Sequence, residues 1–315
     1  MKKNTFWSLA LVAVLAAAVT AVWLDPTQAI RGYLQGDAFF AGRPVRYWRQ
    51  ALKSQDPAVQ QEASRSLEQG GGAAMPVLVA LLADSSADSW ESAESRWRAA
   101  DLLGKLGPEA ADATPALLRA LADDDLHVRT VAAASLGLVA RKESAAEVVP
   151  GLNALVEAGG PASAAASRSL SKFGPRAETA VPPLVKALKA QDSEARWNAA
   201  RTLGKIGPAA QRAVPALIEA MKDGDAKVRE HAAEAVGDIG PAAKDAIPAL
   251  TKALADENAR VRRDAVRSLG QIGPAAKSAL PAVEGLLKDA DANVREAATR
   301  TQRILSGGPA PEKAS

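Results

Sequence analysis

A period of 33 residues constrains the fold of this chain more strongly than any other feature of its sequence. Paired Gly-Pro residues recur at this spacing, beginning at Gly174, Gly207, Gly240 and Gly273. An earlier pair begins at Gly107, two periods plus one residue before Gly174. Two further columns keep the same step, namely Pro182, Pro215, Pro248 and Pro281, and Arg196, Arg229, Arg262 and Arg295. This agreement indicates a stack of similar structural units.

Each period has the pattern of two short helices, as the unit 208–240 illustrates. Its first apolar set has helical spacing: Val214, Leu217, Ile218 and Met221. Asp223-Gly224-Asp225 then interrupts the pattern, and a second helical set follows: Val228, Ala232, Val236 and Ile239. Gly240-Pro241 ends this helix, as glycine after a helix and a following proline do. Because neither helix can bury its apolar stripe alone, the units must stack.

The sequence therefore predicts an all-α, right-handed α-solenoid of about eight helix pairs over residues 43–306. The unit 43–71 is degenerate, and the unit 72–107 carries six extra residues within 84–95. In the unit 141–174, Ser163 stands where arginine is expected, and Arg303 replaces the usual glycine in the last unit. We expect residues 25–42 to be a linker and residues 307–315 to be a disordered tail.

The N-terminus carries a hydrophobic segment. Residues 6–24 contain no charge, and Lys2 and Lys3 precede them in a short segment, 1–5, that we expect to be cytoplasmic. The length is close to that of a membrane-spanning helix. We therefore predict a single-pass anchor in the cell membrane, with the repeats on the extracytoplasmic side. The alternative is a signal peptide cleaved near Val19-Thr20-Ala21, which leaves the array secreted or periplasmic.

Composition excludes several classes of function. The chain has no cysteine, which rules out disulfides, thiolate catalysis and zinc–thiolate sites. Of its 39 basic residues, two precede the hydrophobic segment, so 37 remain against 36 acidic residues. This balance gives no reason to expect binding to nucleic acid.

The unit AVPALIEAMKDGDAKVREHAAEAVGDIGPAAKD, from Ala213, resembles the short HEAT-like repeat that also occurs in phycobilin lyase subunits. The resemblance covers about residues 43–306 and implies an armadillo-type superhelix. The segment AGRPVRYWRQALKSQDPAV, from Ala41, resembles first repeats of exported, membrane-anchored HEAT-repeat proteins of planctomycete-type bacteria. Together they favour a membrane-tethered, non-enzymatic scaffold that presents its surface to a protein partner.

The alternative hypothesis is a lyase-type or other enzyme subunit that acts on a bound small molecule. Deoxyhypusine hydroxylase, a HEAT-repeat di-iron enzyme, needs several His-Glu pairs, whereas His127 and His231 are the only histidines and neither precedes a glutamate. Ser169-Leu170-Ser171-Lys172 matches a Ser-x-x-Lys motif without its Lys-Thr-Gly partner. We therefore predict no catalytic residue, no cofactor and no metal site.

Acidic and basic residues recur four positions apart across the turn between the two helices. The pairs are Asp125/Arg129, Asp192/Arg196, Asp225/Arg229 and Asp291/Arg295, with Asn258/Arg262 as a fifth. We interpret them as a structural ladder in which each arginine binds a turn aspartate of its own or a neighbouring unit and caps helix ends. The functional alternative is a basic stripe that binds phosphate.

Outward positions of the second helices differ between units, so a partner site can be encoded there. We predict that partner contacts involve Trp197 and Arg201, with Arg168, Arg267 and Trp97 in the same two columns. The alternative is that the tryptophans pack over neighbouring helices and the arginines lie on a solvated face.

Overall fold

The structure is a computed structural model that describes residues 20, 25, 28–84 and 90–307. These residues are almost entirely helical and form two compact units, Met1–Ser135 and Leu136–Ser315. The predicted segments 1–5 and 6–24 lie outside the described residues, apart from Thr20, and so does the tail beyond Gly307. Within the part that is described, no helix is long and apolar enough to span a membrane.

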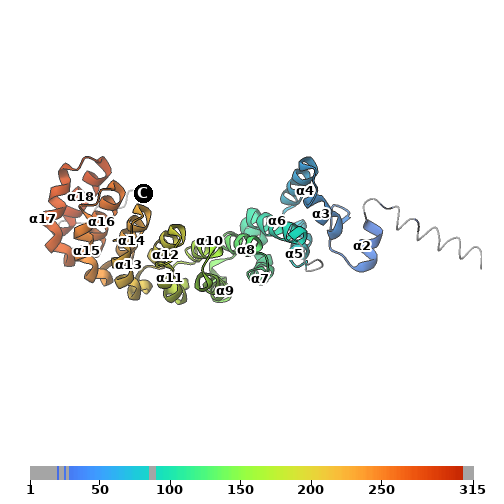
Figure 1. Ribbon diagram of the computed structural model, residues 1–315, viewed down its shortest axis with the longest axis horizontal. Coiled ribbons are helices and arrows are strands. Elements are labelled where there is room, and N and C mark those ends of the chain that lie inside the picture. Colours follow the sequence, from blue (N-terminus) through green and yellow to red (C-terminus); the bar gives the residue numbers. More distant parts are fainter. Residues whose placement is uncertain (1–19, 21–24, 26–27, 85–89, 308–315) are drawn as a thin grey trace, which may run out of the picture. The chain divides into compact units, whose positions relative to one another are not determined.

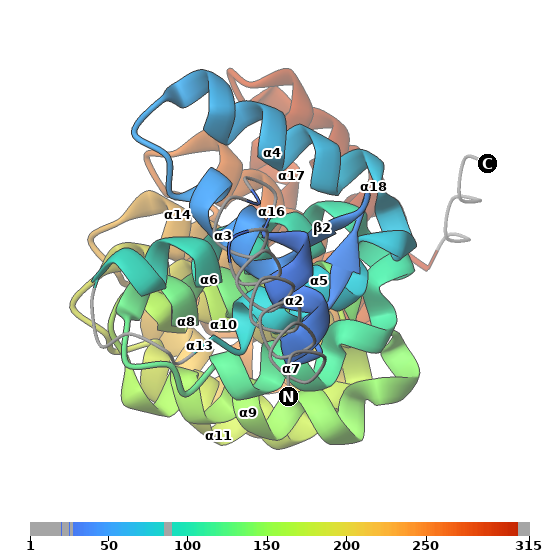
Figure 2. The same ribbon diagram turned by 90° about the vertical axis from the view of Figure 1, so that its right-hand side faces the viewer.

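The first unit begins with an element that the sequence did not predict. Residues 25–42 were assigned to a linker, but they contain a short helix and most of a two-stranded antiparallel hairpin that lies against α3 and α5 (Figure 2). Three helix pairs follow. The elements are α2 (Ala29–Gln35), β1 (Phe39–Phe40), β2 (Arg43–Pro44), α3 (Val45–Leu52), α4 (Pro57–Gln69), α5 (Met75–Leu82), α6 (Trp90–Leu106), α7 (Thr114–Ala120) and α8 (Leu126–Val139), whose last turn lies in the second unit.

The second unit contains five more pairs, so the predicted array of about eight pairs is confirmed for the described residues. The second helices α12, α14, α16 and α18 pack side by side in one layer, and the shorter first helices lie beside them (Figure 1). The elements are α9 (Ala145–Ala158), α10 (Pro161–Leu170), α11 (Val181–Ala187), α12 (Ser193–Ile206), α13 (Val214–Ala220), α14 (Ala226–Ile239), α15 (Ile247–Ala253), α16 (Ala259–Ile272), α17 (Leu280–Gly285) and α18 (Ala292–Leu305).

The Gly-Pro pairs act as predicted and also add an element. Gly240 has a φ of 77°, which ends α14 in a conformation that glycine adopts without strain. A 3-10 segment, Gly240–Ala246, then precedes α15, and Pro248 lies in the first turn of α15, where its missing N–H costs nothing. Each of the three periods within residues 174–272 therefore holds a seven-residue 3-10 segment, a seven-residue first helix and a 14-residue second helix.

Small residues let the second helices approach closely. A Cβ atom added to Gly204 would lie 2.9 Å from the backbone of Ala235 on the next second helix. Hydroxyl groups tie the same helices together, since Thr202 Oγ1 donates to Ser167 O at 2.8 Å and Ser268 Oγ donates to Ala233 O at 2.7 Å. The predicted apolar positions of α14 are all buried: Val228, Ala232, Val236 and Ile239.

The pair α9–α10 departs from the regular unit. No Gly-Pro pair precedes α9, and α9 runs for 14 residues with Pro150 inside it. Its partner α10 has only ten residues and starts at Pro161 without an N-cap hydrogen bond from a side chain. Where the Gly-Pro signal is lost at Ala140-Arg141, the 3-10 segment is therefore shortened to Lys142–Ser144 and the first helix is longer.

Candidate protein-binding surface on the second helices

An arginine ladder joins successive units and positions the second helices. Arg229 donates from Nε and Nη2 to Asp256 of the next unit at 2.8 and 3.0 Å, and Nη1 donates to the carbonyl of Asp223 at 2.9 Å. Both side chains of the pair are 12% exposed. The same bidentate pairing links Arg96 to Asp123, Arg196 to Asp223 and Arg262 to Asp289. A ladder between neighbouring units was predicted, and these contacts show it.

The acidic partners in the ladder differ from the predicted ones. Asp125, Asp192, Asp225, Asn258 and Asp291 cap the second helices through backbone N–H groups. The ladder carboxylates lie two residues earlier in four of these turns, at Asp123, Asp223, Asp256 and Asp289. Of the two predicted alternatives, these four arginines therefore pair with a turn aspartate of the neighbouring unit, and the acids four residues before them cap helices instead. The physical reason is that the capping carboxylate is already aimed at helix amides.

The ladder is interrupted around α9–α10. Its aspartate column carries Val156 and Ala190, and its arginine column carries Ser163. In the described residues, Arg129 and Arg295 donate only to carbonyl groups of their own turns. In the second unit, the bidentate Arg–Asp pairs of the ladder, here called its rungs, therefore lie between α12 and the turn that precedes α18.

Ion pairing lowers the pKa of three ladder carboxyls, those of Asp223, Asp256 and Asp289. Hydrogen bonds from Arg262 hold the pKa of Asp289 below its usual value and outweigh the opposing effect of burial. At Asp256, burial has the larger effect and raises the pKa, but bonds from Arg229 and the Asn258 amide together leave the pKa lowered. The ladder is therefore charged at neutral pH, and its contribution to stability depends on that charge.

Trp197 does not stand free on the surface. Its side chain on α12 is half-buried, and its ring lies 5.3 Å from the ring of His231 on α14, with the planes tilted by 31°. In the first unit, Trp97 has a related contact, with its ring 4.9 Å from His127 and the guanidinium of Arg98 4.4 Å from its centroid. These contacts agree with the alternative in which the tryptophans pack over neighbouring helices, because each ring packs on a histidine of the next second helix.

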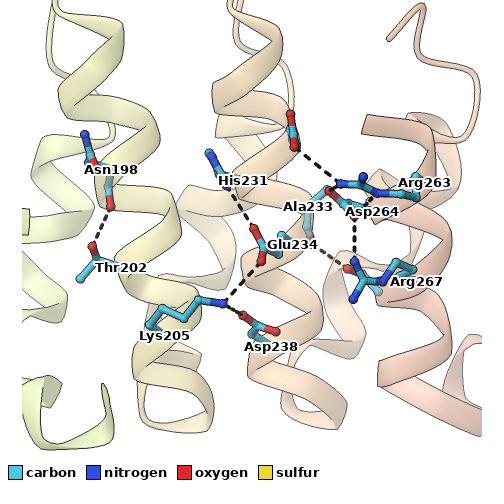
Figure 3. A network of polar contacts seen from close by, with 12 residues as sticks. Asn198, Thr202, Lys205, His231, Ala233, Glu234, Asp238, Arg263, Asp264 and Arg267 are labelled. Carbon is cyan, nitrogen blue, oxygen red and sulfur yellow. Dashed lines mark hydrogen bonds and ion pairs between the residues drawn. The ribbon is translucent and has the colours of Figure 1, made fainter. Parts of the chain in front are cut away.

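Glu234 is the centre of a polar network beside Trp197 (Figure 3). Its Oε2 lies 3.1 Å from Nδ1 of His231, and its Oε1 lies 3.4 Å from Nζ of Lys205. Lys205 also donates to Asp238 at 3.1 Å. The hydrogen bond with His231 and the nearby Lys205 lower the pKa of Glu234 to about 2, against the effect of burial. Lys205 therefore links α12 to α14 through two carboxylates.

A second cluster surrounds the buried carboxylate of Asp264 on α16 (Figure 3). Asp264 is 3% exposed and accepts two hydrogen bonds from Arg263, at 2.8 and 2.7 Å. Arg267 Nη1 lies 3.4 Å from the same carboxylate, and Arg263 Nη2 lies 3.6 Å from Glu230 on α14. Asp264 therefore holds two arginines at the surface of α16.

The predicted partner residues are only partly brought together. Arg168 on α10 lies 3.6 Å from Glu194 on α12, the helix that carries Trp197 and the exposed Arg201. Arg267 lies on α16, so α14 with Glu234 stands between it and Arg201. Trp97 belongs to the other compact unit. The structure therefore supports one local group around Trp197 rather than a continuous arginine row.

Two hollows mark this face of the second unit. One of about 790 Å³ lies over the N-terminal ends of α12, α14 and α16 and is lined by Trp197, Glu194, Glu230, Lys227 and Arg260, among others. Another of about 490 Å³ lies between α16 and α18 and is lined by Arg263, Arg267, Arg300 and Glu296, among others. Both contain mixed charges and accessible space, as protein-binding surfaces do.

Sequence reasoning missed several residues of this surface. His231 was read as an ordinary helix position, although its place 34 residues after Trp197 matches the offset between neighbouring second helices. The buried Asp264 was not selected, and its only sequence signal is an acid between Arg263 and Arg267. No group of three metal-ligating side chains occurs among the residues that the structure describes.

Comparison with known proteins supports the repeat assignment. Residues 152–225 and 214–302 match the family described as HEAT repeats. No curated protein sequence matches the chain. The narrower resemblances, to phycobilin lyase subunits and to planctomycete-type exported proteins, stay predictions.

Two known structures share this fold, and a third is less similar. A crystal structure of an engineered protein is 25% identical, with a TM-score of 0.59 over 84% of this chain and 79% of that one. A second engineered protein is 21% identical over 84% of this chain and 97% of its own, with a TM-score of 0.40. A homology model of the AP-3 complex in an intermediate open conformation is 14% identical, with a TM-score of 0.59 over 81% of this chain and 49% of that one.

Proposed function

We propose that this chain is a non-enzymatic scaffold that binds a protein partner on the second helices of its C-terminal unit. The observation that carries the proposal is the hollow of about 790 Å³ that spans α12, α14 and α16 beside Trp197. An aromatic ring held by a neighbouring side chain and flanked by both signs of charge is typical of an interface anchor. The HEAT-repeat fold supports the same role, because a stacked array exposes a long surface that can vary unit by unit.

The mixed charge of this surface favours a protein over a polyanion. Glu194, Glu230 and Glu234 lie among Arg168, Arg201 and Arg263, and all of these residues except Arg201 form ion pairs across helices. A long phosphate backbone would meet these carboxylates at close range, which is unfavourable. A folded protein or peptide with alternating charges can complement both signs.

The test uses residues 25–315 as bait for proteins from the membranes of the source cells. Arg201→Glu reverses an exposed charge beside Trp197, and Trp197→Ala removes the ring. Arg212→Glu, on the exposed 3-10 segment before α13, is the matched control. We expect the first two variants to lose a captured protein that the parent and the control retain.

Thermal unfolding of each variant separates binding from folding. Because Trp197 packs on His231, its removal is expected to lower the melting temperature, whereas Arg201→Glu is expected to leave it unchanged. Full capture by Arg201→Glu and by a folded Trp197→Ala variant contradicts this location of the site.

We also propose that residues 6–24 anchor the chain in the cell membrane, with the repeats on the extracytoplasmic side. The support is the uncharged length of this segment and the two lysines before it. A reporter that is active only outside the cytoplasm, fused after Ser315, is expected to be active. Recovery of a soluble form beginning at Val22 supports the alternative of a cleaved signal peptide.

A further inference from the structure

The junction between α16 and α18 differs from the other junctions along the second-helix face. Arg168 pairs with Glu194 between α10 and α12, Lys205 pairs with Glu234 between α12 and α14, and Arg263 pairs with Glu230 between α14 and α16. Among the described residues of this face, no ion pair joins α16 to α18. Ion pairs between side chains thus bridge three of these junctions, and the fourth, between α16 and α18, has none among the described residues of this face.

The sequence explains this open junction. Arg267 and Arg300 occupy the same column one period apart, so cations face each other where the preceding junction has Glu234 opposite Arg267. Like charges repel each other, so these two arginines do not pair. Each arginine instead contacts an acid on its own helix. A hollow of about 490 Å³ lies at this junction, with Gly270 and Ala297 in its lining beside the arginines.

The arginines around this hollow keep unused donors. A guanidinium has five N–H groups. The side chain of Arg267 is 57% exposed, with one contact at 3.4 Å to Asp264, and that of Arg300 is 63% exposed, with one carboxylate contact at 2.5 Å to Glu296. Arg263 is held by the buried Asp264, which fixes one wall of the hollow before any ligand enters.

We propose that the hollow between α16 and α18 binds a carboxylate side chain of the protein partner. This inference rests on the proposed function and adds to it the chemistry of a second contact. Two exposed guanidinium groups can donate paired N–H···O bonds to a carboxylate. Such paired bonds fix the orientation of the carboxylate as well as attract it. Arg267 and Arg300 are the residues that bind it, with Thr301 and Asn293 as neighbouring polar groups in the lining.

A carboxylate is favoured over a phosphate ester because the lining also contains Glu296, and Asp264 lies directly beneath the arginines. These acids reduce the net positive charge of the site. A group with one negative charge therefore suits it better than a group with two.

The experiment measures direct binding of short probes to residues 25–315 by calorimetry at low salt. The probes are acetyl-Gly-Glu-Asp-Gly-amide, its Gln-Asn analogue without carboxylates, and inorganic phosphate. The test variant is Arg267→Gln with Arg300→Gln. The control is Arg176→Gln with Arg212→Gln, which changes two exposed arginines on the 3-10 segments before first helices.

We expect the acidic probe to bind the parent and the control equally, and the test variant at least tenfold more weakly. The amide analogue is expected not to bind. Equal binding of the acidic probe by the test variant, no binding by the parent, or tighter binding of phosphate than of the acidic probe overturns the assignment. Unchanged melting of the test variant, measured in parallel, shows that lost binding is not lost folding.

These probes need no partner, so the two proposals fail separately. If no protein is captured through Trp197 and Arg201 but the probes behave as expected, the proposed function fails while the carboxylate site stands. If capture depends on Trp197 and Arg201 and the probes do not distinguish the test variant, only the carboxylate site fails.

Discussion

The pair α9–α10 and the regular pairs from α11 to α18 belong to the same compact unit, but different contacts hold them. The regular pairs are linked by arginines that each bind the carboxylate of the next unit, as in Arg229 with Asp256. Around α9–α10 these positions are occupied by Val156, Ser163 and Ala190. The hydroxyl bond from Thr202 to Ser167 still ties α12 to α10. Close packing and hydroxyl bonds are thus common to both regions, and the ion-pair ladder adds to them.

The strongest test of this difference is to introduce an Arg–Asp pair of the ladder type around α9–α10. Ser163 is 2% exposed, so Ser163→Arg is expected to lower the free energy of unfolding by about 3 kcal/mol, since it overfills the site and buries an unpaired charge. Adding Ala190→Asp supplies a carboxylate 27 residues later, the spacing of the natural rungs, and is expected to recover about 1 kcal/mol.

Urea unfolding of the two single variants and the double variant, analysed as a double-mutant cycle, measures both effects. A neutral or stabilising Ser163→Arg would show that α10 has room for a guanidinium and that the ladder is a property of the period rather than of the regular units.

Removing a natural rung is expected to have the next largest effect. Arg229→Met deletes bonds to Asp256 and to two turn carbonyls, so we expect a loss of about 2 kcal/mol, the range for a partly buried charge-assisted pair. Arg295→Met is the matched control because, among the described contacts, Arg295 binds only two carbonyls of its own turn. We expect it to lose less than about 1 kcal/mol. Equal losses would mean that the carbonyl bonds, not the carboxylates, stabilise the array.

Acid should weaken the regular pairs more than α9–α10. The pKa of Asp289 is lowered in the folded chain, so the unfolded chain takes up the proton first as the pH falls. The stabilisation is therefore full above the unfolded value of about 3.9 and is lost as the pH falls through the lowered pKa.

Hydrogen exchange at pH 5 and pH 3 is expected to show a loss of about 1 kcal/mol in the protection of α16 and α18, and a smaller loss in α9 and α10. Asp289→Asn removes this titrating rung, so its protection in α16 and α18 should change less between the two pH values. A uniform loss along the array contradicts the assignment.

The smallest expected effect concerns the contact that both regions share. Thr202→Val keeps the shape of a buried side chain and removes a hydroxyl that donates to Ser167 O and, within its own helix, to Asn198 O. Because the Ser167 carbonyl also accepts from the Ser171 amide, the loss is expected to be about 0.5 kcal/mol. Ser268→Ala tests the equivalent bond in the regular region, and a similar value is expected there. Chemical unfolding of both variants makes the comparison.

The fold could be predicted from the sequence because the period places glycine, proline and apolar residues at the positions where the backbone needs them. Pro215, Val228 and Gly240 each lie where the helical pattern indicated. The structure at residues 25–42 could not be predicted, because it does not repeat and a two-residue strand carries little pattern of its own.

The candidate site was harder to predict, for a physical reason. Spacing along one helix suggested that Arg229 pairs with Asp225, but the true partner, Asp256, lies in the next unit and is reached through space. The sequence pointed to Trp197 as a candidate partner residue, but the ring that it packs on, His231, comes from another helix. A contact between units leaves a signal in the sequence only when both columns repeat. His231 and Asp264 lie in one column, whose four residues from α12 to α18 all differ: Asn198, His231, Asp264 and Ala297.

The ladder links residues at a fixed offset of 27 positions, and the hydroxyl bonds link residues at a fixed offset of 35. Adjacent units from α12 to α18 thus meet through the same ladder contacts, and a hydroxyl bond is added at each junction except α12–α14, where Ala235 occupies the hydroxyl position. An in-frame duplication or loss of one 33-residue period there would join two ends that already carry matching donors and acceptors. The length of the array can therefore change by whole units during evolution without a new kind of contact between units. Such a change would also bring different surface residues next to one another, as Arg267 and Arg300 are now.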